Sequence, residues 1–168
     1  DVWVPLGRPE YLRQQTELSL RKLKVDSLDL LQLHRIDPKV DRDEQFAVLR
    51  DLQQEGKVKA LGLSQVSVDE LKAAGEYFTV STVQNRYNLT DRSSEDVLKY
   101  SEDNGIGFIP WAPISAGELA RQGGPVDEAA KRLNASTSQV ALAWLLRRSP
   151  VMMPIPGTGS IAHLEDNL

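Results

Sequence analysis

The stretch LDLLQL, residues 28–33, marks the point where the hydrophobic period of the chain changes. Before it, residues 9–24 carry apolar side chains three and four positions apart, a spacing that predicts a helix. The stretch itself is too short for a helix before the turn signal Asp37-Pro38, so it predicts a buried strand. A helix that leads into a buried strand indicates an α/β fold.

The alternation of helix and strand continues to the end of the chain. Further strands are predicted at VKALGL (58–63), VSTVQ (80–84), IGFIPW (106–111) and VMMPI (151–155). The helices predicted between them are one ending at Gly56, one opened by the capping box of Ser67 and Glu70, one started by Ser93 and Asp96, one at 125–133, and one capped by Ser136 and Gln139. Such alternation is typical of parallel strands joined by right-handed crossovers.

Two parallel architectures fit this pattern. An open doubly wound sheet that binds a dinucleotide would carry a glycine-rich turn after an early strand and an acidic residue about 20 positions later, and the sequence lacks that arrangement. We therefore predict an α/β fold of the (β/α)8 TIM barrel type, in a single domain over residues 1–168. A complete barrel takes about 250 residues and eight strands, so we expect an incomplete barrel of about five βα units. Its open edges would be closed by a second copy or by a segment that this sequence lacks.

The composition excludes several classes of function. The 20 Lys and Arg residues are scattered among 24 Asp and Glu, with a formal charge of -4, which argues against nucleic acid as a partner. No apolar run approaches the roughly 20 residues of a membrane span, and the first residues lack the pattern of a signal peptide. We therefore expect no membrane partner and a cytoplasmic location. The lack of cysteine and the two distant histidines predict no metal site.

Chemistry in parallel α/β folds gathers beyond the carboxyl ends of the strands. The predicted strands end in polar or aromatic residues: His34 with Arg35, Ser64 with Gln65, Gln84 with Asn85, Trp111, and Gly157 with Thr158. The imidazole of His34 shares the strand parity of Gln32 and could donate to a substrate oxygen or transfer a proton, although a structural histidine fits equally. The hydroxyl and amide groups of the next two ends suit a planar amide ligand, but turns also begin with such residues. Trp111 fits either a stacking face or a core position.

The closing stretch MPIPGTGSIAHLEDN, residues 153–167, predicts a strand, a tight turn and a fresh helix. Ser160 caps that short helix, whose free N–H groups would suit a phosphate, and His163 could add a positive charge. A plain turn followed by a capped surface helix explains the same residues. The stretch alone leaves both interpretations open.

Taken together, five segments resemble the aldo-keto reductases, in the same order and over nearly the whole chain. They are LDLLQLHRIDP, GKVKALGLSQVSVDEL, TVQNRYNL, GIGFIPWAPISAGEL and IPGTGSIAHLEDN. The resemblance implies a (β/α)8 barrel that reduces aldehydes and ketones to alcohols, passing a hydride from NADPH to a small-molecule carbonyl substrate. It also implies that the five βα units are the C-terminal ones of that barrel.

The resemblance assigns roles to individual residues. His34 is similar to the catalytic histidine that orients and polarises the carbonyl. Ser64, Gln65 and Gln84 match residues that hold the nicotinamide carboxamide, and Trp111 matches the aromatic ring that stacks on it. The loop that follows adds cofactor contacts at Ile114, Gly117 and Leu119. The adenosine end falls to Gly157, Thr158, His163, Asp166 and Asn167.

The sequence departs from the family pattern in three places. Gln65 stands where the family usually has Asn. Gly157 and His163 stand where many members have Lys and Arg, which bind the 2′-phosphate. The resemblance implies NADP(H) as the cofactor, and these two replacements leave NAD(H) open. The catalytic Asp, Tyr and Lys of the family have no match here, and Tyr87 and Tyr100 do not fit the tyrosine's motif. We therefore expect the 168 residues alone to be inactive or weak as a reductase.

Rival functions belong to other classes. A non-catalytic NADP(H)-binding module would keep the cofactor residues without turnover, and a proteolytic fragment would have no function of its own. A Schiff-base lyase would need a lysine near the carboxyl end of a strand, whereas Lys57 and Lys59 lie at the start of theirs.

Overall fold

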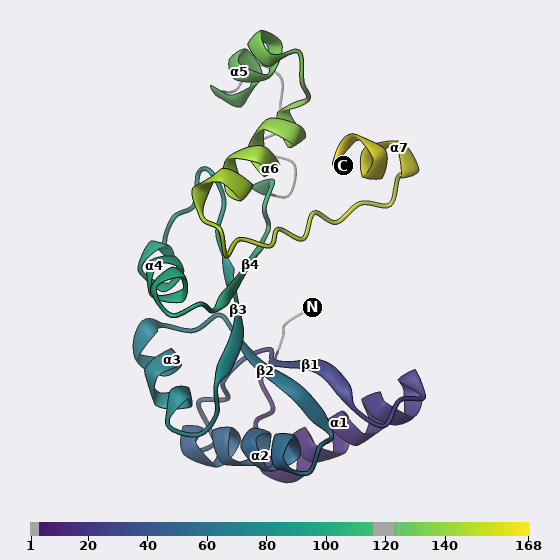
Figure 1. Ribbon diagram of the computed structural model, residues 1–168, viewed down its shortest axis with the longest axis vertical. Helices are drawn as coiled ribbons and strands as arrows, with labels where there is room; N and C mark the ends of the chain where they lie inside the picture. Colours follow the sequence, from purple (N-terminus) through teal and green to yellow (C-terminus); the bar gives the residue numbers. More distant parts are fainter. Residues whose placement is uncertain (1–3, 116–122, 124) are drawn as a thin grey trace. The chain divides into compact units, whose positions relative to one another are not determined.

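Helices and strands alternate along the chain, as the sequence pattern predicts. The computed structural model describes residues 4–115, 123 and 125–168, and the chain divides into two units, Asp1–Val83 and Gln84–Leu168. The elements, coloured along the sequence in Figure 1, are α1 (Pro9–Leu23), β1 (Leu28–Leu33), α2 (Arg42–Gln54), β2 (Val58–Ser64), α3 (Val68–Gly75), β3 (Val80–Arg86), α4 (Glu95–Asp103), β4 (Gly107–Trp111), α5 (Pro125–Leu133), α6 (Thr137–Arg148) and α7 (Ile161–Asp166). Among these described helices, none has the length and apolar character needed to cross a membrane.

The strands are parallel, which confirms the predicted α/β class. β1 pairs with β2 in a register that runs from Leu28 opposite Val58 to Leu33 opposite Leu63. The strand order follows the sequence, β1-β2-β3-β4, and β3 runs from the first unit into the second.

The predicted strand at 151–155 is reduced to an isolated parallel bridge between Phe108 and Met152. Phe108 N–H donates to Val151 O and Met153 N–H donates to Phe108 O, each at 2.8 Å. The next rung of this parallel ladder would need an N–H at residue 110 to donate to Met153 O, and Pro110 has none. The described residues therefore contain four strands where the sequence predicted five.

The helix starts follow the predicted serine caps in three of four cases, and one of the three is Ser160 at the start of α7. Ser67 and Ser136 each form the predicted capping box, with Glu70 and Gln139 at the third helical position. The predicted start at Ser93 is wrong, because its hydroxyl donates to Asp91 Oδ1 at 2.7 Å and the helix begins after Ser94. Asp91 thus draws the serine into a turn instead of a cap.

The core of the first unit lies between its strands and helices. In Figure 1, α1 and α2 lie side by side under β1 and β2. Phe46 of α2 is fully buried, and its ring meets Phe78 edge-on at 6.1 Å and Tyr77 at 6.0 Å. These apolar contacts hold α2 against the chain that leads into β3.

Gly62 lies where β2 passes close to β3. A Cβ at this position would come within 2.2 Å of Thr82 Oγ1 and 2.9 Å of the backbone Thr82 O. We expect Gly62→Ala to lower the free energy of unfolding by about 1–3 kcal/mol, because the backbone cannot move aside without strain. Urea unfolding followed by circular dichroism measures it.

Gly75 provides the matched control, since a Cβ added there would meet no atom within 4 Å beyond its chain neighbours and the backbone of its own helix. Gly75→Ala is expected to leave the stability unchanged or to raise it by up to about 1 kcal/mol through helix propensity. Equal effects at Gly62 and Gly75 would contradict the close packing of β2 on β3.

A cluster of charges joins α1 to the segment between α2 and β2. Glu55 accepts from Arg13 at 2.7 Å and pairs with Lys57 at 2.9 Å, and Lys57 also donates to Glu17 at 2.8 Å. The hydrogen bonds from Arg13 and Lys57 lower the pKa of Glu55 to about 2. The cluster therefore stabilises the fold while Glu55 is ionised.

This cluster predicts an acid-dependent loss of stability. Because the pKa of Glu55 in the fold lies below its ordinary value of 4.5, its contribution is complete above that pH and is lost as the pH falls toward about 2. Urea midpoints measured across this range should fall less steeply for Glu55→Gln than for the unmodified chain. Parallel curves for the two proteins would show that the ion cluster contributes nothing.

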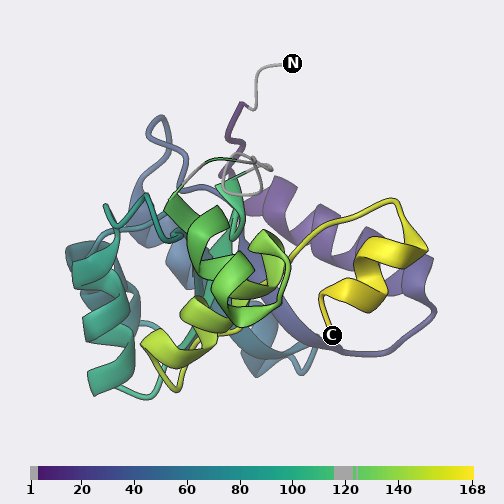
Figure 2. The ribbon, with the colours of Figure 1, turned by 90° about the horizontal axis from the view of Figure 1, so that it is seen from above.

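The second unit is built around Tyr87. Its side chain is fully buried, meets Phe108 edge-on at 5.7 Å and stacks on Trp144 of α6 at 6.0 Å. Its hydroxyl donates to Glu95 Oε2 at 2.5 Å, and Glu95 also pairs with Arg148. The helix α5 packs on α6 in the same unit (Figures 1 and 2).

Candidate functional site

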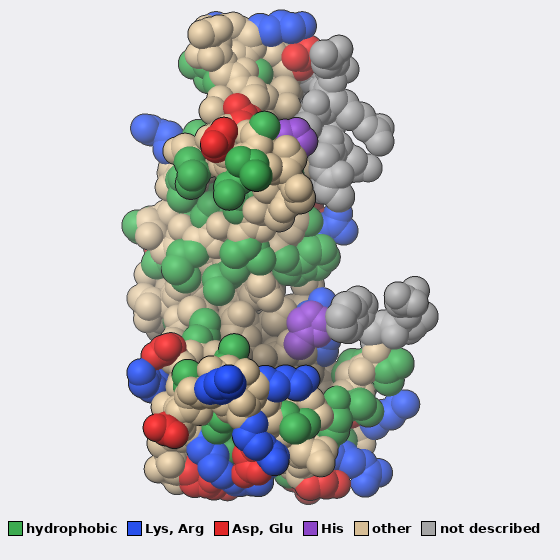
Figure 3. All heavy atoms as spheres, turned by 90° about the vertical axis from the view of Figure 1, so that its right-hand side faces the viewer, with side chains coloured by type: hydrophobic (Ala, Val, Ile, Leu, Met, Phe, Trp, Pro, Cys, Tyr) green, Lys and Arg blue, Asp and Glu red, His purple; other side chains and the backbone are tan. Residues whose placement is uncertain are grey.

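The carboxyl ends of β1 and β2 bring the first predicted site residues together. His34 follows β1 directly and is exposed, while Ser64 ends β2 and is buried. Arg35 joins them, because its Nη1 donates to His34 O and, at 3.0 Å, to Ser64 Oγ. Both histidines of the chain, His34 and His163, reach the surface (purple in Figure 3).

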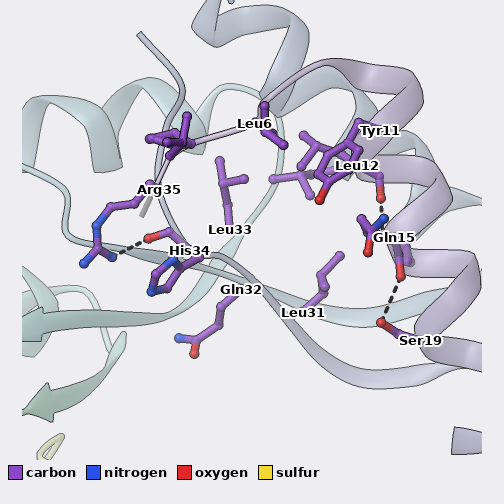
Figure 4. Close-up of a pocket in the computed structure, with 14 residues that line it drawn as sticks. Leu6, Tyr11, Leu12, Gln15, Ser19, Leu31, Gln32, Leu33, His34 and Arg35 are labelled. Carbon is purple, nitrogen blue, oxygen red and sulfur yellow. Dashed lines mark hydrogen bonds between the residues drawn. The ribbon is translucent and has the colours of Figure 1, made fainter. Parts of the chain in front are cut away.

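Figure 4 shows His34 and Gln32 on one side of β1, and Leu31 and Leu33 on the side of α1. This alternation is the parity that the sequence predicted for the imidazole. Gln32 Nε2 donates to Thr82 Oγ1 at 2.9 Å. A polar contact on this side of the sheet therefore links β1 to β3. A pocket of about 260 Å³ opens between β1, α1 and the segment that precedes α1, and His34 and Arg35 are among the residues that line it.

Hydrogen bonds to Asp37 hold the loop that carries His34 in place. Asp37 is 4% exposed and accepts the backbone N–H groups of Gly7 and Lys39, each at 2.9 Å, which hold the pKa of its carboxyl below the usual value. Gln45 of α2 accepts from Asp37 N–H at 2.9 Å and donates to Asp37 O at 3.0 Å. These bonds fix the loop between β1 and α2, and with it the position of His34 and Arg35.

Two strand ends have unusual backbone conformations. Gln65, directly after β2, has a φ of 57°, and Ala112, directly after β4, has a φ of 53°. Such left-handed conformations cost a non-glycine residue about 1–2 kcal/mol, and they collect at functional sites. Gln65 is exposed, and its predicted contact with the nicotinamide stays a prediction.

The ends of β3 and β4 supply the next predicted residues. Gln84 lies in β3 and Trp111 ends β4, and both are half-buried. The guanidinium of Arg86 lies 5.4 Å from the centre of the Trp111 ring. Asn85 is buried and donates to Ser94 Oγ at 3.3 Å, so its amide has a structural use before α4.

The loop after β4 is described only in part. Ile114 is half-buried and packs against the buried pair Val126 and Ala141. Gly117 and Leu119 lie outside the described residues, so their predicted contacts with a cofactor stay predictions.

The closing stretch forms the predicted turn and capped helix. Gly157 and Thr158 are exposed, and Thr158 Oγ1 accepts from Ser160 N–H at 3.1 Å. Ser160 caps α7 by accepting from His163 N–H at 3.4 Å. Asp166 and Asn167 follow at the end of α7, and Asp166 Oδ2 accepts from Ser136 Oγ at 2.6 Å.

The predicted residues thus form separate groups, each within its own unit. The first unit joins His34 and Ser64 through Arg35, for which the sequence had predicted no role. The place of Arg35 after His34 at a strand end was the one feature of the sequence that could have indicated its role. Its hydrogen bond to Ser64 spans 29 residues and follows only from the pairing of the two strands. In the second unit, hydrogen bonds link Thr158 to Ser160 and Ser160 to His163.

Known proteins match almost the whole length of this chain. The model of the aldo/keto reductase family matches residues 1–168. An uncharacterised oxidoreductase from Schizosaccharomyces pombe is 51% identical over 166 residues, and pyridoxine 4-dehydrogenase from Escherichia coli is 34% identical over 172 residues. An aldo-keto reductase structure from Klebsiella pneumoniae in complex with NADPH is similar with a TM-score of 0.84 at 26% identity.

The matches cover the chain almost completely but only part of each relative. They cover 99% of this chain and 54% of the S. pombe relative, 99% and 60% for the E. coli enzyme, and 98% and 61% for the K. pneumoniae structure. The chain thus spans just over half of these proteins, and the four parallel strands of its described residues match part of the barrel structures of aldo-keto reductases. On the match of the family model to all 168 residues, the chain belongs to the aldo/keto reductase family.

Proposed function

We propose that residues 1–168 carry the cofactor side of an NADP(H)-dependent oxidoreductase that reduces aldehydes and ketones to alcohols. The observation that carries this proposal is the group at the ends of β1 and β2, where Arg35 joins the exposed His34 to Ser64. In this proposal the 168 residues form one domain of the reductase.

The residues at the strand ends suit the nicotinamide. When bound, NADPH supplies a hydride to the carbonyl carbon of the substrate. Ser64 and Gln84 offer hydroxyl and amide groups that match the hydrogen-bonding pattern of a carboxamide, and Gln65 adds a second amide. Trp111 offers a flat face for the nicotinamide ring. Arg35 would hold the Ser64 hydroxyl oxygen as an acceptor, and the hydroxyl proton would then be oriented toward the carboxamide oxygen.

His34 has the role of the catalytic residue in this proposal. Its imidazole lies on the polar side of β1 with Gln32 (Figure 4). A ring N–H there would donate to the carbonyl oxygen of the substrate, which orients the carbonyl and stabilises the negative charge that develops on that oxygen. The proton for the alkoxide would come from the family's catalytic tyrosine, which has no match in these residues.

In this proposal, α7 and the turn before it bind the adenosine end of the cofactor. Thr158 and His163 are exposed there, so a hydroxyl and an imidazole can reach a 2′-phosphate. Asp166 and Asn167 offer a carboxylate and an amide to the adenine. Gly157 and His163 replace the Lys and Arg of many family members. We therefore expect this chain to bind NADPH more tightly than NADH, but with a smaller difference in affinity than those members have.

A chimera tests the proposed function. The segment of the S. pombe relative that precedes the matched region would be joined to residue 1, and NADPH oxidation would be followed with a small aldehyde. We expect turnover from the chimera and little or none from the 168 residues alone. A folded chimera that binds NADPH without turnover would instead identify a non-catalytic nucleotide-binding module.

A further inference from the structure

We propose that Ser136 is a positioning residue for the adenosine end of the cofactor site and that it acts through Asp166. The inference rests on the proposed function, because that function assigns Asp166 to the adenosine. It concerns a residue of α6 that lies 30 positions before its partner in the sequence. The resemblance to the family had given this residue no part in the site.

Ser136 is held in a fixed place before it meets α7. It is the N-cap of α6, where its Oγ accepts from Gln139 N–H at 3.1 Å and Gln139 Oε1 accepts from Ser136 N–H at 3.0 Å. This reciprocal capping box fixes the backbone and the side chain of the serine. The donor that faces α7 is therefore ordered by a helix of 12 residues.

The hydroxyl of Ser136 donates to Asp166 Oδ2 at 2.6 Å. This is the length of a strong O–H···O⁻ hydrogen bond, in which the acceptor is a charged carboxylate. Ser136 and Asp166 are both half-buried, so water competes with the bond less than at an exposed pair. The serine uses its oxygen as the acceptor for the helix cap and its proton for Asp166, so one side chain serves both elements.

The helix α7 depends on such a tether. It has six residues, none of them buried, and isolated helices of this length are unstable in water. Its last turn carries Asp166, and Asn167 N–H donates to His163 O at 3.2 Å. Fixing Asp166 against α6 therefore fixes the turn that also holds Asn167 and His163.

Asp166 remains open to a ligand on the side of Ser136. An open pocket of about 700 Å³ is lined by Asp166, Ser136, Gln139 and Asn134, together with residues of α5. The carboxylate thus sits at the edge of a polar hollow while the serine holds it. Ser136 can therefore position the Asp166 carboxylate while that carboxylate contacts the adenosine.

Variants of Ser136 separate the tether from the helix cap. Ser136→Thr keeps both the cap and the donor. Ser136→Asp keeps the cap but cannot donate, and it repels Asp166. Ser136→Ala loses both, and Ser67→Ala loses the equivalent capping box of α3, which belongs to the first unit.

The readout is the Kd of the chimera for two probes, adenosine 2′,5′-bisphosphate and reduced nicotinamide mononucleotide. We expect the Kd for the bisphosphate to rise roughly ten-fold in Ser136→Ala and further in Ser136→Asp, because a hydrogen bond to a charged group is lost. The Kd for the mononucleotide should stay unchanged in both. Ser136→Thr and Ser67→Ala should bind the bisphosphate like the unmodified protein, and Ser136→Ala should have no further effect when Asp166 is already alanine.

Two results would overturn the positioning role. One is unchanged bisphosphate affinity in Ser136→Asp, and the other is an equal loss for both probes, which would indicate a general effect on folding. An unmodified chimera that binds neither probe would contradict the proposed function itself, and the inference with it. The two failures are therefore distinguishable.

Discussion

Replacing Tyr87 by alanine is expected to lower the free energy of unfolding of the second unit by about 3–5 kcal/mol. The side chain is fully buried between Phe108 and Trp144, and its removal would leave a cavity between β4 and α6. It would also remove the hydroxyl that donates to Glu95 at 2.5 Å. Urea unfolding followed by near-ultraviolet circular dichroism measures the change, because the ring of Trp144 reports on this packing.

The matched control is Tyr87→Phe, which keeps the ring and removes only the hydroxyl. We expect it to cost about 1–3 kcal/mol, as is typical for a hydrogen bond to a charged group. Tyr87→Ala and Tyr87→Phe with equal effects would contradict the packing role of the ring. An alanine variant as stable as the unmodified chain would contradict the placement of Tyr87 in the core.

Replacing His34 by glutamine is expected to lower kcat of the chimeric reductase by about 10²–10⁴-fold, the range typical of a lost proton-transfer or hydrogen-bonding partner. The imidazole is exposed on the polar side of β1, so we expect the loss to come from the chemistry. Steady-state kinetics with a small aldehyde would measure it. The Kd for NADPH should stay unchanged, because the proposal assigns the cofactor to other residues.

Thermal unfolding of the His34→Gln chimera serves as the control for folding, and the Tm should match that of the unmodified chimera. A kcat within about three-fold of the unmodified value, well short of that typical loss, would assign His34 to structure instead of catalysis. That outcome would favour the structural-histidine alternative that the sequence had left open.

The order of the fold could be predicted from hydrophobic periods and helix caps. LDLLQL and VKALGL are short apolar runs between turn signals, and the structure has β1 and β2 at those places. The errors have local causes. The strand predicted at 151–155 shrinks to one bridge because Pro110 lacks the N–H of the next rung, and the cap predicted at Ser93 is drawn into a turn by Asp91. Hydrophobic periodicity registers neither the missing donor nor the competing hydrogen bond.

The candidate site could be predicted as far as the strand ends. Carboxyl ends of neighbouring parallel strands meet at one edge, so His34 and Ser64 were expected near each other. Arg35 and Ser136 were missed in their roles because each acts through one side-chain hydrogen bond to a distant segment, Ser64 or Asp166. Such bonds follow from rotamers and from the pairing of elements, which a single sequence does not specify.

The central claim is that these residues bind NADP(H), and a titration of the 168-residue chain with NADPH tests it most directly. Tryptophan fluorescence would be followed in the unmodified chain and in Trp111→Phe, with NADH in parallel. The account predicts saturable quenching by NADPH, tighter binding than for NADH, and reduced quenching in the variant. No saturation with either cofactor, in a chain shown to be folded by circular dichroism, would contradict it.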